Sequence, residues 1–350
     1  MKFNLGDTIT LDQYIHEALY NAKHGYYMNK NPFGKDGDYI TAPNISVMFS
    51  EMIAIWIISY WKNLGSPKNF NLIELGAGNG EMMKQMIESF QRFPDFESSC
   101  NVNILEKSNF LKKIQKLKLK NKKIRWLKDL YQLDRLPGIF VANEFFDALP
   151  VKQFIKKDKL WYEKNVKFTQ KKMKFVDISF NMKQFEKKIG FDISNDQNII
   201  EFSPLAMDYL KTISNNIKNS SGGILIIDYG YIGKKIKNTL RAISNHKFTD
   251  VLHNFGKSDI THNINFNLIS KIAKEFGLKS SKVTTQKKFL LKLGILERAE
   301  ILSKNLSFSK KTDIYFRIKR LIDENQMGHL FKVMFITNHK NKFTLGFETD

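Results

Sequence analysis

The sequence predicts an α/β fold, in which helices cover both faces of a mostly parallel β-sheet. The first observation is a short apolar run at residues 69–75 that enters a glycine-rich turn and then a helical pattern. The second is a series of further apolar runs, separated by helical patterns, at residues 101–105, 124–127, 138–142 and 222–228. Alternating strands and helices are typical of a parallel sheet. With 350 residues, 42% of them hydrophobic, the chain can also bury a full core.

Residues 1–65 are expected to form an N-terminal helical and lid segment. Residues 10–19 begin with a threonine suited to a helix N-terminus and place apolar side chains at helical spacing. A polar, glycine-rich loop follows, ends at Thr41 and Pro43, and precedes a long apolar helix at residues 46–64. Such a loop can close over a ligand, although its residues also suit ordinary turns, and the residues alone favour neither.

Residues 66–150 are expected to form the cofactor-binding half of the fold, and a glycine-rich turn marks its ligand site. Gly76, Gly78 and Gly80 leave room for a ligand and lead into a helix N-terminus, although an ordinary strand-to-helix turn is the alternative. The spacing differs from the G-x-G-x-x-G pattern that binds a pyrophosphate, and Glu74 before it would repel phosphate and attract a cation. S-adenosyl-L-methionine carries an ammonium and a sulfonium but no phosphate, so it suits this loop better than NAD.

Two acidic residues after the next strands are candidate cofactor ligands. Glu106 directly follows the apolar run at 101–105, where the carboxyl end of a parallel strand faces the ligand crevice. Its carboxylate can accept hydrogen bonds from both ribose hydroxyls, although a glutamate here can also cap the helix that begins near Ser108. Asp129 follows the third strand, at residues 124–127, and is expected to meet the adenine ring.

The fourth strand, at residues 138–142, is expected to deliver the catalytic residues Asn143, Glu144 and Asp147. Methyl transfer from a sulfonium is an in-line displacement, so the protein must align the acceptor and hold the developing charge. Two carboxylates can orient a planar or amine acceptor, while Asn143 can accept an N–H and is also a candidate cofactor ligand. In the alternative interpretation, Asn143 caps a short helix and the two phenylalanines after Glu144 enter the core.

Residues 151–200 change to short alternating stretches, which indicate an antiparallel insert on the substrate side. Residues 201–350 are expected to complete the α/β fold with additional helices. The fifth strand, at 222–228, is apolar as burial on both faces requires, and it places Asp228 and Tyr229 at its carboxyl end as substrate or lid residues. The remaining expected elements are helices at 266–276, 286–306 and 315–322 and a closing antiparallel strand at 331–336.

Six short motifs occur in an order that resembles the class I S-adenosyl-L-methionine-dependent methyltransferases. They also resemble, more narrowly, the family of the mitochondrial complex I assembly factor that methylates arginine, and its bacterial relatives. The similarity extends roughly from Leu11 to Phe335 and is weakest in the lysine-rich stretch after Pro150. The motifs are Gly25-Tyr26-Tyr27, Gly37-Asp38-Tyr39-Ile40-Thr41-Ala42-Pro43, Glu74 to Gly80, Asn143-Glu144-Phe145-Phe146-Asp147-Ala148-Leu149-Pro150, Ile227-Asp228-Tyr229-Gly230 and Asp259-Ile260-Thr261.

This resemblance implies a Rossmann-like methyltransferase with a seven-stranded, mostly parallel sheet. It implies transfer of a methyl group from S-adenosyl-L-methionine to a protein arginine, whose guanidinium Glu144 and Asp147 can bind. It also favours a role for Asp38, Thr41 and Pro43 in closing the site. Two alternatives stay open, namely an assembly factor or scaffold that binds the cofactor without turnover, and a methyltransferase that acts on a small molecule or RNA.

The amino-acid composition limits the kinds of ligand and partner that the protein is expected to bind. The net charge is +21, but all except seven of the 56 basic residues are lysine, which favours a solvated surface over a nucleic-acid patch. No two histidines stand at metal-ligand spacing with a carboxylate, so no metal is expected. The only cysteine, Cys100, excludes an intramolecular disulfide, and no apolar run is long enough to cross a bilayer. A cytoplasmic, bacterial-type protein is expected, because the first 20 residues are acidic rather than continuously apolar or arginine-rich.

Overall fold

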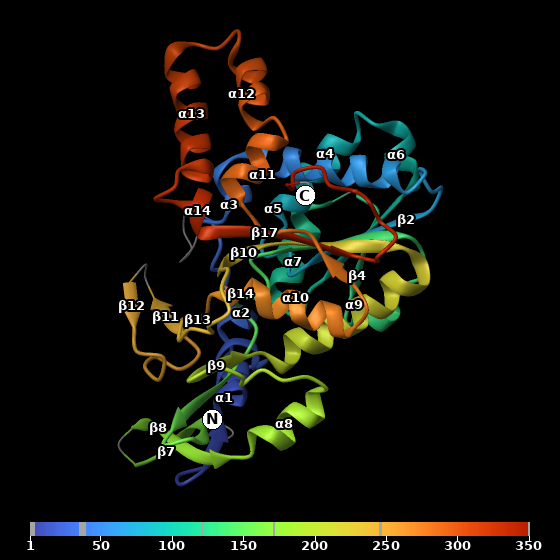
Figure 1. The fold of residues 1–350 in the computed structure, drawn as a ribbon. Helices are drawn as coiled ribbons and strands as arrows, with labels where there is room; N and C mark the ends of the chain where they lie inside the picture. Colours follow the sequence, from blue (N-terminus) through green and yellow to red (C-terminus); the bar gives the residue numbers. More distant parts are fainter. Residues whose placement is uncertain (1–3, 35–39, 121, 171, 245–246, 349–350) are drawn as a thin grey trace.

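The centre of the computed structural model is a nine-stranded β-sheet (Figure 1). The structure describes residues 4–34, 40–120, 122–170, 172–244 and 247–348. The strands of this sheet are β2 (Phe70–Leu75), β3 (Cys100–Leu105), β4 (Ile124–Leu127), β5 (Gly138–Asn143), β10 (Gly222–Tyr231), β14 (Ile264–Asn265), β15 (Lys279–Ser280), β16 (Thr284–Thr285) and β17 (Phe331–Thr337). Seven of them lie in the order β15-β17-β10-β5-β2-β3-β4, while β14 pairs with β10 and β16 with β17.

The core of the sheet is parallel, as the sequence predicts. Strands β4, β3, β2, β5 and β10 run parallel to their neighbours in this row, and β17 lies antiparallel between β10 and β15. The five predicted parallel strands and the closing antiparallel strand are therefore confirmed. The sheet nevertheless has nine strands rather than seven, because two-residue strands such as β14 and β16 carry no periodicity that a sequence pattern can reveal.

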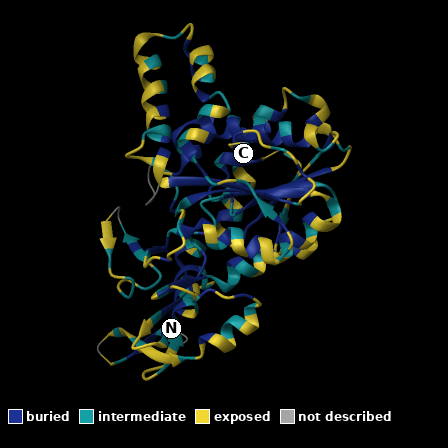
Figure 2. Cartoon of the chain, in the orientation of Figure 1, coloured by how far each residue is buried: buried dark blue, intermediate teal, exposed yellow. Residues whose placement is uncertain are grey.

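Side chains of the sheet alternate between two hydrophobic clusters, one on each face. Leu72, Val141 and Leu225 join the first cluster, whereas Ile73 and Ala142 join the second. The sheet and the helix faces that cover it are buried (Figure 2). The first face is covered by α4 (Val47–Asn63), α5 (Glu81–Phe90), α6 (Pro94–Ser99), α11 (Gln286–Lys292), α12 (Ile295–Ser303) and α13 (Phe308–Ile322), and the second by α9 (Pro204–Ser220) and α10 (Phe266–Glu275).

Short helices connect these layers, and one predicted helix is divided. The helix expected over residues 286–306 is two helices, α11 and α12, because Gly294 between them adopts a φ of +83°. Helices α12 and α13 project from the body of the molecule as a hairpin (Figure 1). The connecting elements are α2 (Tyr26–Asn29), α3 (Ala42–Ile45), α7 (Asn109–Lys118), the 3₁₀ helix η1 (Leu130–Gln132) and α14 (Met327–Leu330).

A second, five-stranded sheet forms from the insert and the N-terminus, and all of its pairs are antiparallel. It contains β1 (Thr8–Thr10), β6 (Lys152–Lys157), β7 (Leu160–Phe168), β8 (Met173–Phe180) and β9 (Ile199–Phe202), with α8 (Met182–Ile189) between β8 and β9. Antiparallel strands were expected here, but the pairing of β1 with β7 was not. Helix α1 (Leu11–Tyr20), whose expected start at Thr10 is found, packs with Val166 of β7 in a third hydrophobic cluster.

A third sheet of three short antiparallel strands lies beside the carboxyl ends of the central strands (Figure 1). Its order is β12 (Lys247–Thr249), β11 (Arg241–Ser244) and β13 (Asp259–Thr261). None of the helices in the described part of the chain is long and apolar enough to span a membrane.

Candidate functional site

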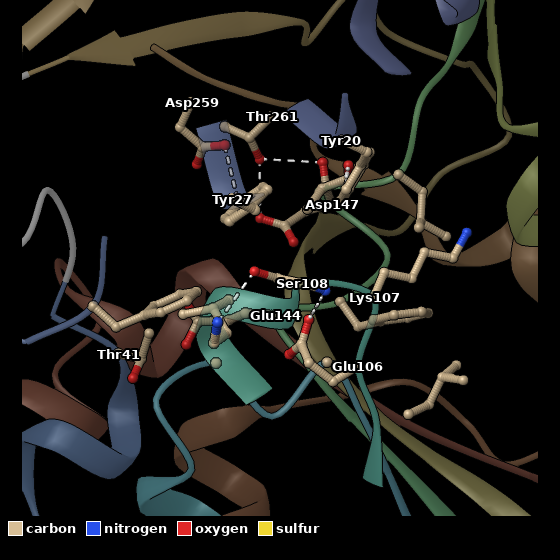
Figure 3. Close-up of a pocket in the computed structure, with 18 of the residues that line it drawn as sticks. Tyr20, Tyr27, Thr41, Glu106, Lys107, Ser108, Glu144, Asp147, Asp259 and Thr261 are labelled. Carbon is tan, nitrogen blue, oxygen red and sulfur yellow. Dashed lines mark hydrogen bonds between the residues drawn. The ribbon is translucent and has the colours of Figure 1, made fainter. Parts of the chain in front are cut away.

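A cavity opens at the carboxyl ends of β2, β3, β5 and β10, and residues of the N-terminal helices and of the three-stranded sheet also line it. Figure 3 shows residues that line this cavity. Its empty volume, including the part open to solvent, is about 1100 Å³. Parallel α/β sheets bind ligands at this edge. A smaller cavity of about 380 Å³ adjoins it and shares five lining residues with it. The polar residues that line the larger cavity are Tyr20, Tyr27, Thr41, Glu106, Lys107, Ser108, Glu144, Asp147, Tyr209, Tyr229, Arg241, Asp259 and Thr261.

The glycine-rich turn connects the two cavities. Gly76 and Gly78 line both of them. Their φ values of +67° and +53° are rarely adopted by residues other than glycine. A Cβ atom on Gly78 would lie 3.2 Å from the ring of Phe33, which also lines both cavities. Gly80 lines neither cavity, because it forms the N-terminus of α5 and faces Gln115.

Glu74 provides a buried carboxylate next to this turn. It lines the smaller cavity with only 3% of its surface exposed, and its Oε2 has no hydrogen-bond partner among the described residues. Burial, together with the nearby Glu106, raises the pKa of Glu74 to about 8. Burial therefore favours the protonated form of Glu74, and a cationic ligand that pairs with this group would stabilise its ionised form.

Glu106 is held at the end of β3 by two hydrogen bonds. Its Oε1 accepts the backbone N–H of Ser108 at 2.8 Å, and its Oε2 accepts the side-chain amide of Gln115 at 2.9 Å. Gln115 also donates to the carbonyl of Gly78, so it ties the glycine turn to Glu106. Burial raises the pKa of Glu106 and these donors oppose the rise. A carboxylate has about four acceptor positions, so Glu106 keeps capacity for ligand hydroxyls after these two bonds.

Asp129 lies apart from the cavity. Its side chain is exposed, and its Oδ1 accepts the backbone N–H of Tyr131 at 3.0 Å as the N-cap of the 3₁₀ helix η1. It does not line the cavity. The structure therefore does not bring Asp129 together with Glu74 and Glu106.

The loop after β5 carries the residues expected to be catalytic. Asn143 and Glu144 line the smaller cavity, and Glu144 and Asp147 line the larger one. Glu144 has a φ of +51°, a conformation that costs a residue with a side chain about 1–2 kcal/mol. Strained backbone of this kind persists only where surrounding contacts impose it, and it is common at functional sites. Asn143 does not cap a helix here, because an irregular loop follows it.

Asp228 imposes this loop conformation. One oxygen, Oδ2, accepts the backbone N–H groups of three successive residues, Phe145 at 3.2 Å, Phe146 at 2.9 Å and Asp147 at 3.4 Å. The other oxygen accepts the N–H of Tyr229 at 2.8 Å, and the residue is fully buried. Asp228, which the sequence suggested as a substrate or lid residue, therefore positions the loop from inside the fold. Tyr229 lines the cavity.

Glu144 and Asp147 differ in their partners. Burial and the neighbouring Asp147 raise the pKa of Glu144 to about 8, while hydrogen bonds from Asn143 and from the backbone of Ala42 oppose the rise. Asp147 accepts the Thr261 hydroxyl through Oδ2 at 2.9 Å, and burial raises its pKa. Its Oδ1 and the Oδ1 of Asn143 are buried without a partner among the described residues. These two acceptors at the adjoining cavities are thus free to bind donors of a ligand.

Four further residues that the sequence did not single out as site residues also line the larger cavity. Tyr27 donates to Asp259 Oδ1 at 2.8 Å, and Tyr20, whose ring stacks on that of Tyr27, donates to the carbonyl of Ala148. Arg241 lies over the ring of Tyr229. The signals for Tyr27 and Asp259 were present, because both lie in motifs that carry the resemblance. Their contact joins residues 232 positions apart, which local patterns cannot reveal.

Helix α3 lies beside both cavities through Thr41, its N-cap, and Pro43 in its first turn. Thr41 lines both cavities and accepts the Asn44 side-chain amide at 2.6 Å, and Pro43 lines the smaller cavity. Asp38, the third residue expected to close the site, lies outside the described residues. Among the described residues, no group of three or more histidine, cysteine, aspartate or glutamate side chains is arranged to hold a metal ion.

The chain is similar to known proteins over most of its length. The profile of a family of S-adenosyl-L-methionine-dependent methyltransferases matches residues 52–284. The mitochondrial protein arginine methyltransferase NDUFAF7 of Xenopus laevis is 30% identical over 95% of this chain and 81% of its own length. The human protein of the same name is 29% identical, over 95% of this chain and 80% of its own length.

A solved structure shares the fold. A protein from Burkholderia thailandensis, crystallised with S-adenosyl-homocysteine, is 23% identical over 97% of this chain and 90% of its own, with a TM-score of 0.82. The α/β methyltransferase fold expected from the sequence is therefore confirmed. Taken with the family profile and the similarity over nearly the whole length, these findings show that the chain belongs to the family of S-adenosyl-L-methionine-dependent methyltransferases.

Proposed function

We propose that this enzyme transfers a methyl group from S-adenosyl-L-methionine to an arginine side chain of a protein. The relatives reported above, named as protein arginine methyltransferases, support this acceptor. The observation that carries the proposal is the gathering of Glu144, Asp147 and Asp259 around one cavity beside the glycine turn. Three carboxyl groups in a protein of net charge +21 make this cavity a local site for a cationic side chain.

The residues at the glycine turn fit the cofactor. The unpartnered carboxyl group of Glu74 suits an ammonium group, Gly76 and Gly78 line both cavities without side chains of their own, and Glu106 keeps acceptor capacity for ribose hydroxyls. S-adenosyl-L-methionine supplies the methyl group on a sulfonium. Glu74, Gly76, Gly78 and Glu106 would bind it, so that the acceptor residues act on the neighbouring side of the cavity.

Glu144 and Asp147 would hold and orient the guanidinium group. A guanidinium donates its N–H groups in a planar fork that matches carboxylate oxygens, and the free Oδ1 atoms of Asp147 and Asn143 are available acceptors. As the N–CH₃ bond forms and the S–CH₃ bond breaks, one acceptor N–H proton must leave. Glu144 is suited to receive it, because the neighbouring guanidinium cation would favour its ionised form, and a carboxylate whose pKa burial raises to about 8 is a better base than an exposed one.

Thr261 and Asp228 support these groups without binding the substrate through their own side chains. The Thr261 hydroxyl fixes one oxygen of Asp147 and thereby leaves the other for the acceptor. Asp228 fixes the loop that gives Glu144 its strained backbone conformation. Thr41 and Pro43 lie at the edge of the same space, and we propose that their segment closes over bound ligands.

The test is methyl transfer from tritiated S-adenosyl-L-methionine to three separate acceptors. These are a mixture of arginine-containing peptides, the same peptides with lysine in place of arginine, and total RNA. We expect label only in the arginine peptides, recovered as methylarginine after acid hydrolysis and lost in the Glu144→Gln variant. Label in RNA or lysine peptides would contradict the proposed acceptor. Cofactor binding without transfer to any protein or RNA would favour a scaffold.

A further inference from the structure

The three-stranded sheet presents one face to the cavity. Arg241 and Ile243 on β11 and Asp259 and Thr261 on β13 all line the cavity. Arg241 pairs with Thr261 and Ile243 with Asp259, and directly opposed residues of antiparallel strands point to the same face. This face of the sheet is therefore one wall of the acceptor site.

The outer strand extends the same face beyond the cavity. Phe248 on β12 is the cross-strand partner of Ile243, so its side chain points to the face that carries Ile243 and Asp259. Asp259, Ile243 and Phe248 thus form one row across the three strands. The side chain of Phe248 is 76% exposed, although Phe is among the residues most often buried in proteins.

We propose that this face binds the polypeptide segment next to the methylated arginine, and that Phe248 contacts an apolar side chain of that segment. The inference rests on the proposed function, since it assumes that the arginine enters the cavity between Glu144, Asp147 and Asp259. The occupant is a protein segment because the face is continuous with that site. Exposed aromatic side chains beside a binding site are typical anchors for a partner.

The spacing of the strands sets the distance between the two side chains of the substrate. Neighbouring strands lie about 4.8 Å apart, so Phe248 on β12 is about 10 Å from Asp259 on β13 along the row. An extended chain advances about 3.3 Å per residue. Side chains of an extended chain that point to the same face are an even number of residues apart, so a segment that crosses the sheet along this row places its apolar side chain two or four residues from the arginine.

The experiment uses a set of nine-residue peptides of glycine and serine with one central arginine and one leucine placed at each other position in turn. Binding is measured by fluorescence anisotropy with S-adenosyl-homocysteine present, and transfer is measured with tritiated S-adenosyl-L-methionine. We expect leucine two or four residues from arginine to improve both affinity and kcat/KM about tenfold over a peptide without leucine, and leucine at odd separations to have little effect. The Phe248→Ser variant should lose this preference and Phe248→Leu should keep most of it.

Phe308 supplies the matched control. It is 87% exposed on the projecting helix α13, away from the cavity, so Phe308→Ser should keep the leucine preference. N-acetylarginine amide, which cannot reach β12, should be methylated equally by the wild type and Phe248→Ser. The proposal is overturned if no leucine position improves binding, or if the preference persists in Phe248→Ser.

The two readouts separate this proposal from the proposed function. Tighter binding of the leucine peptide through Phe248, without transfer to arginine, would keep the docking face and contradict the arginine acceptor. Transfer to arginine without any effect of leucine would keep the acceptor and contradict the docking face.

Discussion

Replacement of Gly78 by alanine tests whether the glycine turn is the cofactor site. At a φ of +53°, a side chain costs about 1–2 kcal/mol, and the loss of glycine flexibility in the unfolded chain returns about 0.5–1 kcal/mol. The net loss of stability should be about 1 kcal/mol, which lowers the Tm of a chain of this size by a few degrees at most. The new Cβ would meet the Phe33 ring at 3.2 Å, so the ring must shift by a few tenths of an ångström.

That shift should reduce cofactor affinity, because Phe33 and Gly78 line both cavities. We expect the Kd for S-adenosyl-homocysteine to rise at least about tenfold, equivalent to about 1.4 kcal/mol of binding free energy. Isothermal titration calorimetry measures the Kd, and thermal unfolding measures the stability.

Gly190 provides the control for backbone strain alone. It ends α8 with a φ of +92°, and a Cβ there would meet nothing within 4 Å. Gly190→Ala should therefore lower stability by a similar amount and leave the Kd unchanged. Unchanged affinity in Gly78→Ala, or an equal loss of affinity in Gly190→Ala, would refute the assignment of the turn as the cofactor site.

Three further predictions concern the carboxylates. Asp228→Asn leaves one acceptor oxygen for N–H groups that now bind two different oxygens, so it should lower the free energy of unfolding in urea by about 2–3 kcal/mol. It should also lower kcat, while calorimetry should find the cofactor affinity retained. An unchanged kcat would show that Asp228 does not position the catalytic loop. The pKa of Glu74 is about 8 in the folded protein and about 4.5 in the unfolded chain, so the stability of the cofactor-free protein should fall as the pH rises from 4.5 to 8. In thermal unfolding, Glu74→Gln should make the stability depend less on pH over this range. If Glu74→Gln leaves the pH dependence of stability unchanged, the pKa of Glu74 is not raised by burial. Asp147→Asn should lower kcat at least a hundredfold with little change in cofactor Kd, and undiminished transfer would exclude Asp147 from catalysis.

Local patterns predicted the parts of the fold and site that depend on short stretches of chain. The strand before Gly76, the strand before Asn143 and the acidic residue after β3 were recognisable because an apolar run and the residues at its end are contiguous. The same contiguity placed Glu74, Glu106 and Glu144 at one edge of the sheet, since parallel strands share the edge at which they end.

Contacts between distant segments could not be predicted in this way. Strand β1 pairs with residues of β7 that lie 155–159 positions later, and the three residues of β1 carry too little pattern to specify a partner. Asp228 was placed correctly at the end of its strand, but its role depends on backbone groups 81–83 residues earlier that it meets only in the folded chain. Asp129 follows β4 as expected, but its side chain accepts a hydrogen bond from the backbone N–H of Tyr131 in the next turn, as aspartate side chains often do.

The most direct test of the account is a crystal structure of the enzyme with S-adenosyl-homocysteine and an arginine-containing peptide. We expect the cofactor product to lie against Gly76, Gly78, Glu74 and Glu106, and the guanidinium group of the peptide to lie between Glu144 and Asp147. A cofactor product bound elsewhere, or an arginine outside the reach of both carboxylates, would contradict it.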